Sequence, residues 1–132
     1  MIDIEQQVIN IVKNALSGSV EHIYSEYSAS PSEFPCVMVQ EIDNSMYINS
    51  QDASSFENHS EVSYQIDIYT TGTNKKFEAK RIAKLVDEAL ASKKFTRVSC
   101  RQVSNAYDDK IYRYVVLYSA IIGKDYYVYS IK

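Results

Sequence analysis

The stretch EVSYQIDIYTTGTNKKFEAKRIAKLVDEAL, residues 61–90, decides the fold because two hydrophobic periods meet in it. Its first ten residues alternate between apolar and polar, as in a half-buried strand of an antiparallel sheet. The apolar face consists of Val62, Tyr64, Ile66 and Ile68. Gly72 then breaks the strand, and Thr73 or Asn74 can cap a helix. The buried stripe of this helix is formed by Ala79, Ile82, Ala83, Val86, Ala89 and Leu90.

The same stretch contains an Asp followed by Glu-x-Lys, the skeleton of many metal-dependent nucleases. Two carboxylates would hold a divalent ion, and the lysine would help to activate the attacking water. This chemistry needs the Glu and the Lys on one strand, where residues i and i+2 point the same way. Glu78 and Lys80 fall in the predicted helix, where they lie about 200° apart and cannot face one ion. We therefore expect Asp67 on the solvent face of its strand, and the nuclease stays a minor alternative.

The rest of the chain adds a first helix and further strands on both sides of this stretch. Residues 3–17 carry an apolar stripe at helical spacing, with Asp3 as a cap and Gly18 as a stop. Strands are expected at residues 20–27, 36–42, 95–107 and 110–122, with a possible last edge strand at 125–132. Residues 43–60 form a long polar connection. We predict one α+β domain over residues 1–132: a mostly antiparallel sheet with two helices packed on one face, in the order α-β-β-β-α-β-β.

The composition is that of a globular domain and offers few groups for catalysis. The chain has 132 residues, of which 45% are hydrophobic, which is enough for one core. No apolar run approaches the roughly 18 residues that span a membrane, and the acidic start does not resemble a secretion signal. Cys36 and Cys100 lie in apolar runs without a second metal ligand, so we expect buried, reduced thiols. We therefore assign no catalytic, cofactor-binding or metal-binding residue.

Charge is divided along the chain, although the net charge is only −3. Residues 1–74 hold one base, Lys13, and 11 acids, whereas residues 75–132 hold 13 bases and 6 acids. The strands of the two halves can interleave, so that the charges mix on the surface and stabilise the fold only weakly. Alternatively, an acidic surface of one copy meets a basic surface of the next, which is a head-to-tail contact that can close into a ring.

Two groups of residues are candidates for such surfaces. The first is an acidic loop that faces a lumen or a neighbouring subunit, with Glu41, Asp43, Asp52, Glu57 and Glu61 in or beside it. Such a loop would repel phosphate and let DNA slide past, but it can equally be a solvated loop. The second is a row on the second helix, formed by Lys76, Lys80, Arg81 and Lys84. Because the chain is acidic overall, we favour a solvated face for this row, then a partner contact, over a nucleic-acid patch.

Tyrosine is the second compositional bias, with 12 Tyr and no Trp. Tyr112, Tyr114 and Tyr118 share one face of their strand, and a further group crowds the C-terminus. That further group is Tyr126, Tyr127 and Tyr129. Tyr suits half-buried strands, and it is also enriched in protein interfaces. A tyrosine face beyond the core would be a docking surface.

Four segments in order resemble the small tail terminator, or head–tail joining, proteins of long-tailed phages and prophages, which are often called minor capsid proteins. The segments are EFPCVMVQEIDN, YQIDIYTTG, KKFEAKRIAKLVDEAL and FTRVSCRQVSNAYDDKIYRYVVLYSAII. The resemblance covers residues 34–122 and lies in the order and spacing of the segments. The C-terminal YYVYSIK is less typical of the family.

The resemblance implies an α+β subunit of a hexameric ring, with no catalytic residue and no cofactor. Such a ring sits on the last ring of the tail tube, stops its polymerisation and offers a surface to the neck of the filled head, while DNA passes through without specific binding. The expected place is the tail–head junction of the virion, after assembly in the host cytoplasm, with no membrane contact. Alternatives are another neck, head-closure or minor capsid protein, the nuclease, and a small-molecule-binding domain without a pocket signature.

Overall fold

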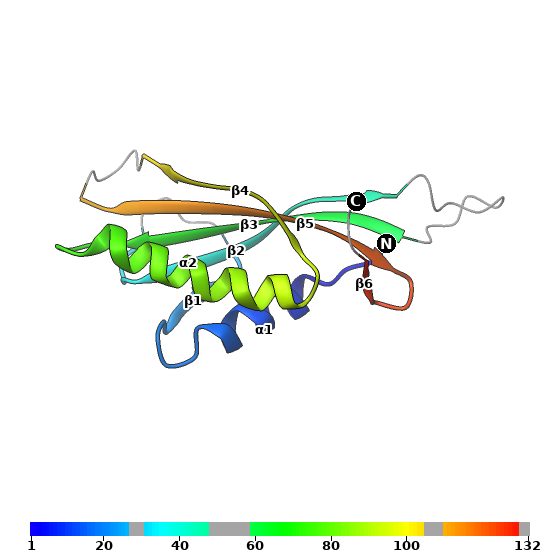
Figure 1. The fold of residues 1–132 in the computed structure, drawn as a ribbon, viewed down its shortest axis with the longest axis horizontal. Coiled ribbons are helices and arrows are strands. Elements are labelled where there is room, and N and C mark those ends of the chain that lie inside the picture. Colours follow the sequence, from blue (N-terminus) through cyan, green and yellow to red (C-terminus); the bar gives the residue numbers. More distant parts are fainter. Residues whose placement is uncertain (27–30, 48–58, 105–109, 130–132) are drawn as a thin grey trace.

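The computed structural model describes residues 1–26, 31–47, 59–104 and 110–129, and its elements follow the predicted α+β order (Figure 1). The helices are α1 (Glu5–Ala15) and α2 (Lys75–Ser92). The strands are β1 (His22–Tyr24), β2 (Cys36–Met46), β3 (His59–Thr70), β4 (Thr96–Val103), β5 (Tyr112–Gly123) and β6 (Val128–Tyr129). No described helix is long and apolar enough to cross a membrane.

The strands form one sheet in the spatial order β1-β2-β3-β5-β4, and β6 pairs with β5. All pairs are antiparallel except β1 with β2, so the sheet is mostly antiparallel as predicted. Strand β3 is central and pairs along its length with β2 and β5. In this register Asp67 lies opposite Met38 on one side and Val115 on the other.

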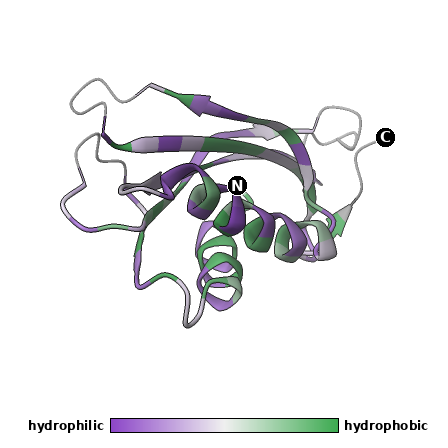
Figure 2. Cartoon of the chain, turned by 60° about the vertical axis from the view of Figure 1, so that its left-hand side comes forward, coloured by the Kyte–Doolittle hydropathy of each residue, from purple (hydrophilic) through white to green (hydrophobic). Residues whose placement is uncertain are grey.

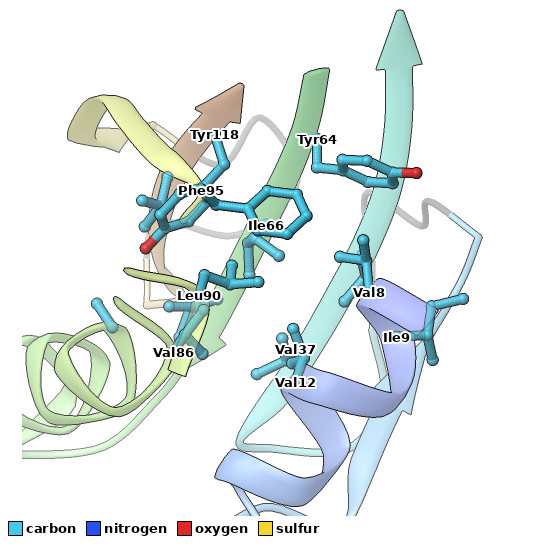
Figure 3. Close-up of a cluster of buried hydrophobic side chains, with 14 of the residues drawn as sticks. Val8, Ile9, Val12, Val37, Tyr64, Ile66, Val86, Leu90, Phe95 and Tyr118 are labelled. Carbon is cyan, nitrogen blue, oxygen red and sulfur yellow. The ribbon is translucent and has the colours of Figure 1, made fainter. Parts of the chain in front are cut away.

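Both helices cover the same face of the sheet, which confirms the predicted layers (Figure 1). The even-numbered side chains of β3 point to this face, because alternate residues of a strand point to opposite sides. Val8 and Val12 of α1 and Val86 and Leu90 of α2 are fully buried, and they gather around Ile66 (Figure 3). Hydrophobic and hydrophilic residues alternate around both helices (Figure 2). Burial of each of the apolar core side chains stabilises the folded state by about 1.5–3 kcal/mol.

The helix boundaries differ slightly from those read in the sequence. Helix α1 begins at Glu5 rather than at residue 3, and the Asp3 Oδ1 accepts a hydrogen bond of 3.0 Å from the Glu5 backbone N–H. Asn74 occupies the N-cap position of α2, as predicted. Its side chain makes no capping hydrogen bond, so that part of the prediction is wrong. Gly72 has φ +95°, a conformation that favours glycine and turns the chain from β3 into α2.

Strands β2 and β3 are longer than predicted, and the polar connection is shorter. Strand β2 runs to Met46 across a β-bulge at Ile42, and β3 begins at His59. The sequence argument failed here because polar residues can pair within a sheet, here β3 with both β2 and β5, and satisfy their backbone hydrogen bonds without an apolar pattern. The paired ends of β2 and β3 extend beyond both helices (Figure 1). We call residues 43–47 and 59–63 the β2–β3 arm.

Candidate functional site

The acidic group divides between β2, β3 and residues that are not described. Glu41 and Asp43 lie in β2 and Glu61 lies in β3, whereas Asp52 and Glu57 lie outside the described residues. Glu41 and Glu61 thus lie in strands beside the connection as expected, whereas Asp43, which was expected in the connection, lies in β2. The reason is the ladder itself, in which Asp43 pairs with Ser63 and Glu61 pairs with Ser45.

Glu41 is partly buried, and its side chain is hydrogen-bonded within the protein. Its Oε1 accepts hydrogen bonds from the Tyr64 hydroxyl at 2.9 Å and from the Asn44 Nδ2 at 3.3 Å. Burial, together with the hydrogen bond to Glu41, raises the pKa of Tyr64 far above its ordinary value. Glu41 therefore satisfies a buried hydroxyl, which would otherwise cost about 1–3 kcal/mol.

Asp43 and Glu61 remain available on the face of the sheet that carries no helix. The register places them as diagonal neighbours, because Asp43 lies opposite Ser63 and Glu61 lies opposite Ser45. The Asp43 Oδ2 accepts a hydrogen bond of 3.0 Å from the Ser45 hydroxyl. In the part of the chain that the structure describes, neither carboxylate pairs with a cation. The arm is thus a region of uncompensated negative charge.

The basic row lies on α2 as predicted, with one member neutralised. Lys76, Lys80 and Lys84 are exposed. The Arg81 Nη2 instead pairs with the Glu78 Oε2 at 2.9 Å, which lowers the pKa of Glu78 and raises that of Arg81. Neither Lys80 nor Lys84 has an ion-pair partner among residues 1–26, 31–47, 59–104 and 110–129. Exposed lysines without ion-pair partners can interact with a ligand or a second protein.

Lys80 and Lys84 line a pocket between α2, β4 and β5 with a volume of about 200 Å³. We call it the basic pocket, and its lining is Lys80, Ala83, Lys84, Asp87, Arg97, Cys100, Tyr114, Val116 and Tyr118. Its one carboxylate, Asp87, accepts from the Tyr118 hydroxyl at 2.9 Å and from the Arg97 Nη1 at 3.1 Å. These bonds leave the two lysines uncompensated.

Cys100 forms part of the wall of the basic pocket and is only partly buried, so the expectation of full burial is wrong for this thiol. Its thiol, together with burial, raises the pKa of Tyr114 to about 12. Cys36 is fully buried as expected, and burial raises the pKa of its thiol to about 11. Because the thiolate is the nucleophile, the two cysteines should differ in reactivity.

The three residues of the nuclease skeleton do not converge. Glu78 and Lys80 lie on α2 as predicted, but Asp67 is fully buried, and the solvent-facing position expected for it is wrong. Its Oδ2 pairs with the Arg113 Nη2 at 2.7 Å. Within the described residues, no group of three His, Cys, Asp or Glu side chains is placed to hold a metal ion. Asp67, the first carboxylate of the nuclease skeleton, therefore belongs to a structural ion pair with Arg113.

The Asp67–Arg113 pair is a structural feature of the helix-free face that sequence reasoning missed. The Asp67 Oδ1 accepts from the Gln65 Nε2 at 2.7 Å, and the Arg113 guanidinium lies 5.8 Å from the centre of the Tyr69 ring. Only 16% of the Arg113 side chain is exposed, so the pair is shielded from water. A signal was present, because Arg113 is a lone charge in an apolar strand that pairs with the strand of Asp67.

Most of the tyrosine face belongs to the core. Tyr112 and Tyr118 are buried against the helices and Tyr114 is partly buried, which favours the packing interpretation over a docking surface. Tyr126 and Tyr127 are exposed and line an open groove of about 550 Å³ between α1, the end of α2 and the C-terminal turn. The side chain of Tyr129 lies outside the described residues.

Alkaline pH should destabilise the protein through Tyr64 and Tyr118. Burial raises the pKa of both above the value of about 10 in the unfolded chain. Their contribution is therefore complete below pH 10 and is lost as the pH rises beyond it. At pH 11 the loss is about 3 kcal/mol for the two groups together. Urea unfolding from pH 8 to 11 measures it, and a Tyr64→Phe, Tyr118→Phe variant should lose stability less steeply. An equal slope in both proteins would contradict the assignment.

The fold is shared with a virion protein. The structure superposes on a chain of the virion of a native gene transfer agent (GTA) particle with a TM-score of 0.55. The match covers 88% of this chain and 89% of that chain, at 13% sequence identity. At this identity the likeness concerns the fold alone. No curated protein matches the sequence.

The family follows from the sequence itself. The family model of the tail completion protein gp17 matches residues 9–123, which is most of the chain. The chain therefore belongs to the tail completion protein gp17 family, and it is a structural protein of a phage tail. This confirms the resemblance on which the sequence argument ended.

Proposed function

We propose that the chain is a tail terminator, which forms a ring of six copies on the last ring of the tail tube and joins the tail to the head. Membership of the tail completion family over residues 9–123 carries this proposal. The charges give it a physical basis, since uncompensated acids lie on the arm and uncompensated lysines lie on α2. Different surfaces that meet head to tail produce a closed ring when the rotation permits.

The proposed partners are the tail tube protein on one side of the ring and a neck or head-completion protein on the other. DNA would pass through the centre without specific binding, because Asp43 and Glu61 repel phosphate. The protein would assemble in the host cytoplasm and remain at the tail–head junction of the virion. A role as another neck, head-closure or minor capsid protein is the second candidate, and it predicts binding to the portal side instead of the tube.

The test is to mix the purified protein with its cognate tail tube protein during polymerisation. A terminator should bind one tube end and shorten the tubes in proportion to its concentration. Binding to portal complexes without any effect on tube length would contradict the terminator role and favour a head-closure protein.

A further inference from the structure

The basic pocket has the charge and size of a site for a small anionic group. Lys80 and Lys84 reach it from consecutive turns of α2, and Arg97 reaches it from β4. Asp87 is already held by Tyr118 and Arg97, so its charge is largely satisfied. Two lysine ammonium groups without carboxylate partners in the described part of the chain remain at the mouth. A carboxylate or a phosphate oxygen placed between them would gain charge-assisted hydrogen bonds.

The acidic counterpart lies in another region of the same molecule. Asp43 and Glu61 lie on the helix-free face of the arm, whereas the basic pocket opens beside α2 on the helical side of the sheet. The arm extends away from the first turns of α2, toward the opposite end of the long axis (Figure 1). A contact between the two surfaces therefore needs a second copy of the chain.

We propose that the basic pocket of one copy binds an arm carboxylate of the next copy, with Asp43 as the exposed acceptor and Glu61 beside it. This inference rests on the proposed ring and identifies the contact that would hold it together. A protein carboxylate fits better than DNA phosphate. Nucleic-acid surfaces carry long runs of cations, whereas this pocket offers two unpaired lysines in a chain of net charge −3. Each copy also supplies one pocket and one arm, as a closed ring requires.

Cys100 allows the anion preference of the pocket to be measured in the free subunit. Iodoacetate is an anion and iodoacetamide is neutral. The rate of alkylation by iodoacetate divided by the rate by iodoacetamide, measured at one thiol, therefore reports the local electrostatic potential. We expect this ratio at Cys100 to fall about fivefold or more in a Lys80→Glu, Lys84→Glu variant. Mass spectrometry of the labelled peptides separates Cys100 from the buried Cys36.

The matched control for this labelling experiment is a Lys13→Glu, Lys93→Glu variant. It makes the same change in net charge at exposed positions outside the pocket, so its ratio should change little. An equal fall in the control and in the pocket variant would mean that the pocket has no anion preference of its own, and would overturn the inference.

Charge reversal then tests the contact between copies. The Lys80→Glu, Lys84→Glu variant and an Asp43→Lys, Glu61→Lys variant should each form rings at least tenfold less well than the wild type. A mixture of the two variants should recover contacts between opposite charges, seen as mixed oligomers by native mass spectrometry. Cys100 should also be protected from alkylation in assembled wild-type rings.

Two outcomes would separate this inference from the proposed function. Wild-type rings that persist in both reversed variants would overturn the contact and leave the terminator role intact. A wild type that forms no ring, even on tail tubes, would overturn both. Loss of DNA binding with unchanged rings in the Lys80→Glu, Lys84→Glu variant would assign the pocket to phosphate and overturn the carboxylate.

Discussion

Asp67→Ala is expected to lower the free energy of unfolding by about 3–5 kcal/mol, because it removes a fully buried carboxylate that pairs with Arg113, whose side chain is only 16% exposed. Asp67 is fully buried, and Arg113 donates to its Oδ2 from Nη2 at 2.7 Å and from Nε at 3.1 Å. The Gln65 amide would lose its acceptor as well. Urea unfolding followed by circular dichroism measures the loss.

Two variants make this prediction specific. Glu78→Ala breaks the exposed Arg81 pair and should cost only about 0–1 kcal/mol. Asp67→Leu combined with Arg113→Met replaces both charges by apolar groups and should recover most of the stability, because a buried pair is costly to break but not to replace. If Asp67→Ala lowers the free energy of unfolding by less than Glu78→Ala does, the account is contradicted.

Phe95→Ala is expected to cost about 3–5 kcal/mol, the usual range for an aromatic side chain removed from a core. Phe95 links the end of α2 to β4 and is only 5% exposed. Its ring meets that of Tyr64 edge to face at 6.4 Å, and it lies beside Ile66 (Figure 3). The substitution would open a cavity between the helices and the sheet, and it would loosen the start of β4 that carries Arg97 to the basic pocket.

The matched control is Phe77→Ala, which removes the same side chain from the exposed face of α2. Phe77 is 70% exposed, so its loss should change the free energy of unfolding by less than about 0.5 kcal/mol. Equal losses at the two positions would show that the burial of Phe95 contributes nothing to stability, and would contradict the description of the core.

The layers of the fold were predictable because they follow from local periods. The alternation along β3 and the helical stripe of α2 each fix which residues face the core, and the structure buries Ile66, Ile68, Ile82 and Val86 as expected. The extent of β2 and β3 was not predictable. Their arm is paired, but its buried side chains are the polar Ser60 and a single apolar residue, Val62, so hydrophobic alternation gives little signal for such a segment.

The partners of charged residues were not predictable, because they come from distant parts of the chain. Asp67 meets Arg113 across β3 and β5, and the basic pocket exists only because β4 returns along α2. The charges of the two halves mix only in part, and the contact between copies stays a prediction. Asp67–Arg113 joins the two halves of the chain, whereas Arg97–Asp87 lies within the basic half. The lysines of α2 and the acids of the arm are left over by this pairing.

The most direct test of the proposed function is electron microscopy of tail tubes mixed with the purified protein, with light scattering to give the mass of the free protein. We predict one ring of six subunits with an open centre at a single end of each tube, whether the free protein is a ring or a monomer. Tubes with both ends bare, or with the protein bound along their sides, would contradict the terminator role.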